Sequence, residues 1–378
     1  MEAETLDDPF GSEDRVRTDR SGIRTFVKEA ATPGLVIFHT VVDNRVLVMD
    51  TDGKVVLEFS DTPDGYSLYR PGKAGDNRNI YCILKSESRY EDRAIASINE
   101  DGKIIWKTKH HHFTHDFHIR HNRRIVTVLR SDREIHGKRI SDNVICDMDI
   151  DGEINWEWSL VDHLEDFAAC DQVTRSVVEK GNDNPFHVNS VQIADYPIVK
   201  ELFGEPAIVA SARNMNTVFL VGRDTGKVLY QLFGETLGQH HARVLPENYG
   251  SSAGNLLIVD NGYGFLPTTG AENRGYSRIL ELEIPSGEIT WSYESTPEQP
   301  HFFSPIVGGQ QRFANGNTLI TEGYFGRLFE IDRDGNIVWD FVHAESLRLE
   351  DHAKSHSVRE TGLRQIYRAY KVNHDWME

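Results

Sequence analysis

Three histidines occupy matching positions near the starts of predicted strands. His115, His187 and His240 each lie four residues before a branched apolar residue in an alternating segment. Neutral imidazole is a nucleophile near pH 7, and protonated imidazole is a general acid. A single histidine in such a place is usually an ordinary polar residue. Three in matching positions of a repeated unit favour a shared chemical role.

The unit that positions these histidines recurs six times along the chain. Each copy is an alternating apolar strand, a glycine turn and a second alternating strand that often holds tryptophan. Glycine accepts the positive φ that tight hairpin turns require, so each copy predicts a β-hairpin. The turn glycines are Gly53, Gly102, Gly152, Gly226, Gly287 and Gly335.

The spacing of these hairpins predicts an all-β fold. Copies lie about 50 residues apart, with two longer intervals, which leaves room for four strands per copy. We therefore predict a six-bladed β-propeller of four-stranded antiparallel blades, its ring closed by a C-terminal strand near 365–372. The long intervals predict insertions near 159–184, 195–205 and 262–276, and the near-helical spacing within 160–181 predicts short helices. Residues 1–20 are predicted to be a mobile tail, and 21–378 a single propeller domain.

This fold predicts where the candidate residues lie. The innermost strand of each blade lines a central channel, so His115, His187 and His240 are expected to face it from blades 3, 4 and 5. Neighbouring residues of a strand face opposite ways, which predicts that His241 points into its blade. Arg213, at the end of the second strand of blade 4, is placed to reach the channel. Its planar fork suits an oxyanion.

Composition excludes several classes of protein. The formal net charge is −18, which argues against a nucleic-acid or anionic-membrane surface. The 3 cysteines show no CxxC spacing, which excludes a disulfide framework and a cysteine-type zinc site. No apolar run approaches the roughly 20 residues of a membrane span. The N-terminus shows no signal peptide, so we expect a cytoplasmic protein.

Several segments, in order, resemble the arylsulfotransferase family. They are Pro185-Phe-His-Val-Asn-Ser-Val, Ala210-Ser-Ala-Arg-Asn, Gly238-Gln-His-His-Ala, Leu256-Leu-Ile-Val-Asp-Asn-Gly and the ending Ile366-Tyr-Arg-Ala-Tyr-Lys-Val. Members are six-bladed propellers that move sulfate between phenols without a nucleotide donor, and so are PAPS-independent. The resemblance runs from about residue 34 to the C-terminus.

The resemblance implies a role for each candidate residue. His240 matches the nucleophile that becomes a transient sulfohistidine. His187, Asn189 and Arg213 match the groups that hold the sulfate oxygens, and His115 matches a channel histidine that transfers protons. The implied reaction is ping-pong between an aryl sulfate and a phenol, with no metal or cofactor and no macromolecular partner.

Two other functions stay open on the sequence alone. The first is a metal-dependent lyase or hydrolase in which His115, His187 and His240 are the metal ligands. The second is a non-catalytic propeller that uses its face for binding. Metal content after dialysis tests the first, and partner binding after substitution of the channel histidines tests the second. The sequence does not determine the donor, the acceptor or the oligomeric state.

Overall fold

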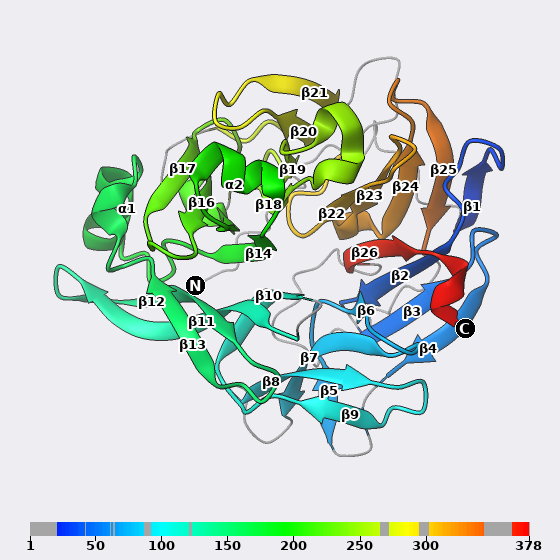
Figure 1. The fold of residues 1–378 in the computed structure, drawn as a ribbon, viewed down its shortest axis with the longest axis horizontal. Coiled ribbons are helices and arrows are strands. Elements are labelled where there is room, and N and C mark those ends of the chain that lie inside the picture. The colour runs from blue at the N-terminus through cyan, green and yellow to red at the C-terminus, as the bar shows by residue number, and fades with distance from the viewer. Residues whose placement is uncertain are drawn as a thin grey trace, which may run out of the picture.

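The computed structural model places six sheets in a ring around a central axis (Figure 1). It describes residues 21–41, 43–60, 62, 65–86, 92–120, 123–264, 272–294, 302–343 and 365–377. Each sheet is one blade, and consecutive strands within a blade pair in antiparallel register. The predicted six-bladed β-propeller is therefore confirmed. The predicted tail, residues 1–20, lies outside the described residues.

The strands of each blade follow one another from the axis to the rim. In the first three blades they are β26 (Ile366–Val372), β2 (Leu35–Thr40), β3 (Arg45–Met49) and β4 (Val55–Phe59); β5 (Tyr66–Leu68) and β6 (Lys73–Ala74), then β7 (Ile80–Ser86), β8 (Arg93–Ile98) and β9 (Ile104–Lys107); and β10 (Phe113–Ile119), β11 (Ile125–Ile135), β12 (Lys138–Met148) and β13 (Ile154–Ser159). In blades 4 to 6 they are β14 (Val188–Ala194), β15 (Ala207–Ala212), β16 (Thr217–Gly222) and β17 (Val228–Phe233); β18 (His240–Val244), β19 (Leu256–Asp260), β20 (Arg278–Leu282) and β21 (Ile289–Glu294); and β22 (Gly309–Arg312), β23 (Thr318–Glu322), β24 (Arg327–Ile331) and β25 (Ile337–Val342).

Both ends of the chain contribute a strand to the ring. The C-terminal strand β26 pairs with β2 and forms the inner edge of blade 1, which confirms the predicted closure. At the other end, β1 (Gly22–Phe26) pairs with β25 and covers the outer edge of blade 6. The sequence analysis did not predict this pairing. It covers the edge of β25, and the short strand β1 becomes the outer edge of this blade.

The outer hairpin of each blade turns at the predicted glycine. All six glycines have positive φ, from 69° at Gly226 to 88° at Gly152. In the first blade, Oδ1 of Asp50 accepts the backbone N–H groups of Asp52 and Lys54. Asn99, Asp149 and Asp332 make the same pair of bonds in their own blades. The polar residue before the turn therefore holds the loop closed, which explains why it recurs.

Apolar side chains fill the junctions between blades. Six buried clusters occur among the described residues, one at each junction between neighbouring blades. A fully buried aliphatic or aromatic side chain contributes about 1.5–3 kcal/mol. Burial on both faces explains why the middle strands are almost continuously apolar, whereas outer strands such as β9 alternate.

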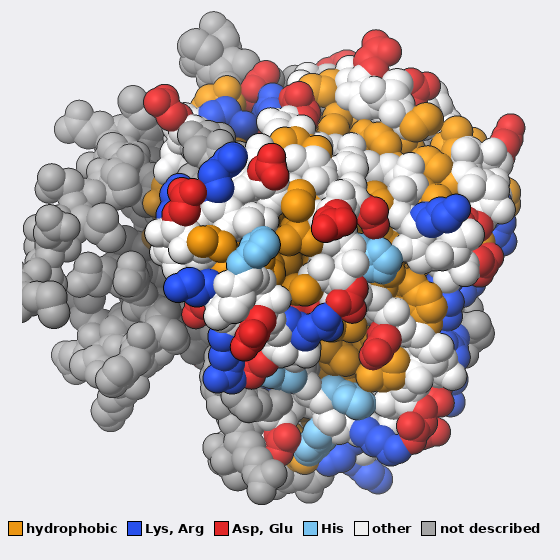
Figure 2. All heavy atoms as spheres, turned by 90° about the vertical axis from the view of Figure 1, so that its left-hand side faces the viewer, with side chains coloured by type: hydrophobic (Ala, Val, Ile, Leu, Met, Phe, Trp, Pro, Cys, Tyr) orange, Lys and Arg blue, Asp and Glu red, His pale blue; other side chains and the backbone are white. Residues whose placement is uncertain are grey.

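The helix signal within 160–181 is confirmed, and a second short helix, which the sequence did not predict, lies in the predicted insertion near 195–205. The helix α1 (Cys170–Lys180) ends at Gly181 with φ 67°, and its Val173 and Val177 join the cluster between blades 3 and 4. The helix α2 (Pro197–Phe203) begins with proline and ends at Gly204, in the left-handed conformation. No helix in the described part of the chain is long and apolar enough to cross a membrane. On the side seen in Figure 2, acidic and basic side chains are interspersed.

Candidate active site

The innermost strands of blades 3, 4 and 5 each carry a β-bulge at the histidine or directly after it. The pairing shifts register between Thr114 and Phe117, between Val188 and Ser190, and between His240 and Arg243. The left-handed residues there are His115 (φ 57°), His187 (φ 53°) and His241 (φ 50°). Positive φ is uncommon outside glycine, and such residues cluster at functional sites.

The structure brings the three predicted histidines together. The ring centroids of His115 and His187 lie 4.5 Å apart. The charge of Arg213 lowers the pKa of both His187 and His240, and His240 in turn lowers the pKa of His115. These residues meet in the channel, by which we mean the region around the axis that side chains of the innermost strands occupy. The alignment of blade starts thus predicted the cluster, while the role of each residue remains a prediction.

His240 is held in one tautomer. Its Nδ1 lies 2.8 Å from Oδ1 of Asn261 and 3.1 Å from the carbonyl oxygen of Gly238. Both neighbours are acceptors, so Nδ1 carries the proton and donates it. The lone pair of the neutral ring is therefore on Nε2. This is the arrangement that a nucleophilic imidazole needs.

Asn261 is a site residue to which the sequence analysis gave no role. Its Nδ2 donates to the carbonyl oxygens of Ser304, at 2.6 Å, and Val307, at 2.8 Å. These two acceptors fix the orientation of the amide, so that Oδ1 must face His240. The signal was present, because Asn261, which directly follows the end of strand β19, lies in the family-like segment that begins at Leu256. Its function depends on a contact that no sequence spacing encodes.

Replacing Asn261 with leucine should lower the rate of the reaction that the resemblance implies for His240 by roughly 10²–10⁴-fold, the scale of losing the residue that orients a catalytic imidazole. Asn261→Asp keeps the acceptor for Nδ1 of His240 but loses the amide that donates to Ser304 and Val307, so it should recover only part of the rate. Its carboxylate would favour the imidazolium form, so the acid limb of the pH–rate profile should move to higher pH. Steady-state rates from pH 4 to 9 measure both effects. A purely structural role for Asn261 would leave the profile of the Asp variant in place.

Arg213 follows strand β15, in a short 3₁₀ turn over Arg213–Met215. Its backbone N–H donates to the carbonyl oxygen of His187 at 3.1 Å, and its Nη1 donates to Oδ1 of Asn214 at 3.0 Å. Burial lowers the pKa of the guanidinium to about 10, so the group stays charged at neutral pH. A buried cation therefore lies beside two of the three histidines.

Three of the five family-like segments, those that begin at Pro185, Ala210 and Gly238, are hydrogen-bonded to one another. Nδ2 of Asn189 donates to the carbonyl oxygen of Gln239 at 2.8 Å, and the Gln239 side chain donates to the carbonyl oxygens of Ala212 and Thr217. Gly238 has φ 64°, and a Cβ there would lie 1.9 Å from the carbonyl oxygen of Tyr263. Asn189 was predicted to hold sulfate oxygens. That role stays a prediction, and the hydrogen bond to Gln239 fixes the backbone just before His240.

The prediction for His241 is wrong. Its ring lies 5.9 Å from that of Tyr370 on the innermost strand of blade 1, and its Nδ1 accepts the backbone N–H of Gln310 at 3.1 Å. It therefore faces the channel and not the interior of blade 5. The strict alternation of side chains holds only in a regular strand, and the bulge between His240 and Arg243 breaks it.

Burial keeps the channel histidines neutral. Desolvation, followed by the charges of Arg213 and Arg70, lowers the pKa of His187 to about 3. Burial likewise holds the pKa values of His115 and His240 well below the usual range, with help from neighbouring positive charges. An imidazole that stays unprotonated over this range is available as a nucleophile, and the arginines give the site a positive potential.

These shifts predict that acid destabilises the fold. Below pH 6.5 the unfolded chain binds protons at histidines that stay neutral when folded, so the free energy of unfolding should fall as the pH drops from 6.5 toward 3. His39 is one such residue, because burial lowers its pKa to about 3. Replacing His39 with leucine should reduce the slope of the unfolding free energy against pH by roughly 1.4 kcal/mol per pH unit. Urea unfolding at pH 7, 6 and 5 measures this slope, and an unchanged slope would contradict the assignment.

The channel does not suit a metal ion. No three His, Cys, Asp or Glu side chains within the described ranges are arranged to hold one. The positive charges of Arg213 and Arg70, which act on His187, would also oppose a cation.

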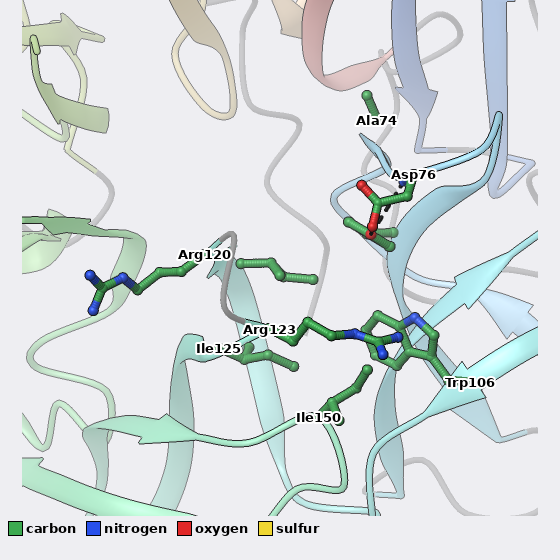
Figure 3. A pocket seen from close by; sticks show the side chains of 9 residues that line it. Ala74, Asp76, Trp106, Arg120, Arg123, Ile125 and Ile150 are labelled. Atoms are coloured by element: carbon green, nitrogen blue, oxygen red, sulfur yellow. Dashed lines mark hydrogen bonds between the residues drawn. The ribbon is translucent and has the colours of Figure 1, made fainter. Parts of the chain in front are cut away.

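A separate pocket of about 250 Å³ lies at the turn between β10 and β11, the other end of β10 from His115. Figure 3 shows Arg123 and Trp106 among its lining residues, with Arg120 pointing away from Trp106. None of the predicted site residues lines this pocket.

Comparisons with known proteins give a family and a fold. The sequence model of a family described as arylsulfotransferase (ASST) matches residues 91–344, a range that includes every predicted site residue. No curated protein matches the chain. A crystal structure of a protein of unknown function from Bacteroides caccae is similar, with 13% identity, a TM-score of 0.54, and 89% of this chain and 98% of that chain covered.

Two lyase structures show weaker similarity. A streptogramin B lyase has 16% identity and a TM-score of 0.46, with 86% of this chain and 83% of that chain covered. A catalytically inactive variant of virginiamycin B lyase from Staphylococcus aureus has 12% identity and a TM-score of 0.45, with 85% of this chain and 88% of that chain covered. Structural likeness at these identities concerns the fold alone.

Proposed function

We propose, from the premise that this chain belongs to the arylsulfotransferase family, that it moves a sulfuryl group from an aryl sulfate to a phenol through a covalent intermediate on His240. The observation that carries this proposal is the environment of His240. Its Nδ1 is tied to two acceptors, which leaves the Nε2 lone pair available beside the cation of Arg213.

In the first half-reaction, Nε2 of His240 attacks the sulfur of the aryl sulfate. The N–S bond forms as the bond from sulfur to the aryl oxygen breaks, and the aryl oxygen keeps the electron pair. Positive charge then grows on the imidazole ring. Oδ1 of Asn261 stabilises this charge, because it already accepts the Nδ1 proton.

Positive side chains stabilise the transferring group. Arg213 is the residue best suited to the sulfuryl oxygens, since a guanidinium donates two parallel hydrogen bonds. His187 is positioned to add a third donor. Its Nδ1 lies 3.0 Å from Nδ2 of Asn184, which places the ring proton on Nε2.

A proton carrier completes each half-reaction. His115 lies against His187 and is neutral in the empty site. A bound anionic group would raise its pKa and favour the protonated form. His115 then gives its proton to the departing phenolate and takes one back from the acceptor phenol, as the sulfuryl group leaves His240. Proton transfer of this kind contributes about 10²–10⁴-fold.

Incubation of the full chain with 4-nitrophenyl sulfate, with and without phenol, tests this function. Intact mass spectrometry should show a gain of about 80 Da, the mass of SO₃, on one histidine, and phenol should remove it. Peptide mapping should place the group on His240. Release of nitrophenol with no adduct, and no formation of phenyl sulfate, would contradict the proposal.

A further inference from the structure

Beyond the histidines, one buried carboxylate in the channel faces three cations. Asp116 is fully buried, and its carboxylate oxygens lie 2.9 Å from Nζ of Lys73, 2.8 Å from Nη2 of Arg243 and 3.1 Å from Nη1 of Arg368. The three cations come from the innermost strands of blades 2, 5 and 1. Asp116 is the only acidic partner they have within the part of the chain that the structure describes.

The charges of this group do not cancel. Burial opposes ionisation of Asp116, but Lys73, Arg368 and Arg243 hold its pKa well below the usual value. Burial opposes the charge of Arg368 too, yet Asp116 keeps its pKa above the ordinary value. His241, next to them, is neutral, because burial and the charge of Arg368 lower its pKa. One negative and three positive charges leave an excess of two positive charges around a fully buried carboxylate.

Buried hydrogen-bond donors in this group also lack partners. Arg368 is fully buried, and its Nε and Nη2 donate to none of the described residues. The N–H of Gln310 donates to Nδ1 of His241, so the ring proton must be on Nε2, and Nε2 has no partner among these residues either. A buried donor without an acceptor costs about 1–3 kcal/mol. Such donors indicate an acceptor supplied from outside the chain.

The geometry of the free edge of Arg368 indicates what kind of acceptor fits. Nε and Nη2 form one side of a guanidinium, with two parallel N–H bonds. Elsewhere in this protein the same edge holds a carboxylate, since Nε and Nη2 of Arg327 donate to the two oxygens of Asp340 at 2.9 and 3.1 Å. The edge of Arg368 is therefore suited to a group that presents two oxygens.

A glycine brings the donors of two blades together. A Cβ on Gly309 of blade 6 would lie 2.6 Å from Cγ of Arg368 and 3.4 Å from Nδ1 of His241. Any larger residue would displace Arg368. The bare backbone of Gly309 thus lets Arg368 from blade 1 and His241 from blade 5 pack against the same point.

We propose that the channel contains a second anion site, built from donors other than those at His240, at which the free edge of Arg368 and Nε2 of His241 bind a small oxyanion. Lys73 and Arg243 supply the remaining positive potential. The ligand is a free tetrahedral oxyanion, or the carboxylate or sulfonate of a small molecule. The site does not depend on the proposed sulfuryl transfer, since none of its donors takes part in that reaction.

Crystals of the full chain soaked separately in selenate and in 4-iodobenzoate test the proposal. Anomalous scattering from selenium should give a peak beside Nε and Nη2 of Arg368 if a free oxyanion binds. A carboxylate of 4-iodobenzoate at that position, with its iodine further along the channel, would assign the site to a larger anion. Either result supports the site. Absence of both from the neighbourhood of Arg368 would overturn it, even if selenate binds beside Arg213 and His240.

Two variants of Arg368 test in solution whether its charge or its paired donors bind the anion. Arg368→Lys keeps the charge and loses the paired donors, whereas Arg368→Met loses both. Calorimetry in the Arg213→Met background, which removes anion binding at His240, measures the affinity of the second anion site for selenate. This affinity should fall about tenfold or more in the Lys variant and further in the Met variant. Thermal unfolding without selenate reports whether each variant folds. Folded variants with unchanged affinity would overturn the proposal.

Discussion

Replacing His240 with asparagine should abolish sulfuryl transfer, with a fall of about 10⁴-fold or more in turnover, because the atom that forms the N–S bond is removed. Asparagine is polar, smaller than histidine and not nucleophilic. It keeps a group near Asn261, so the fold should survive. Transfer from 4-nitrophenyl sulfate to phenol, measured with the intact-mass adduct, gives both the rate and the intermediate.

A matched control for this variant is His39→Asn. His39 is buried on strand β2, and burial lowers its pKa to about 3, as it does for His187. The control variant should keep its activity and its adduct. If the His240 variant still carries the adduct, or if the adduct maps to His115 or His241, the assignment of the nucleophile is wrong. If no channel histidine matters for activity, the binding-module alternative gains support.

Replacing Arg213 with methionine should lower kcat/KM for the aryl sulfate by roughly 10³-fold, since the variant loses the cation that faces the charge developing on the sulfuryl oxygens. Arg213→Lys keeps the charge but not the planar fork, so it should lose about 10–10²-fold. Kinetics with aryl sulfates of different leaving-group acidity measure these losses.

The stability of the Arg213 variants separates function from structure. Burial already lowers the pKa of this guanidinium to about 10, so the folded protein holds the charge at a cost. The methionine variant should therefore unfold within a few degrees of the parent, despite its low activity. A variant that loses activity only in proportion to its loss of folded protein would contradict a direct role for Arg213.

The sequence by itself predicted the architecture, because the signals for it are local. Each hairpin has a glycine that accepts positive φ, and in four of the six a polar residue a few positions earlier caps the turn. Six such hairpins at a nearly constant interval leave few folds other than a propeller. The same regular spacing placed His115, His187 and His240 at matching points of three blades. The pairing of β1 with β25 carried no such local signal.

Only the tertiary structure decided how these residues face one another. Alternation along a strand predicted that His241 turns into its blade, but the bulge at blade 5 adds a residue and turns the ring to the channel. The tautomer of His240 depends on Asn261, which directly follows the next strand of the same blade, and the proposed second anion site brings together Arg368 of blade 1 and His241 of blade 5. A periodic pattern predicts which face of its own strand a side chain occupies. Contacts between residues that are far apart in the chain depend on how the blades pack around the axis, and the spacing of residues along the sequence does not contain that information.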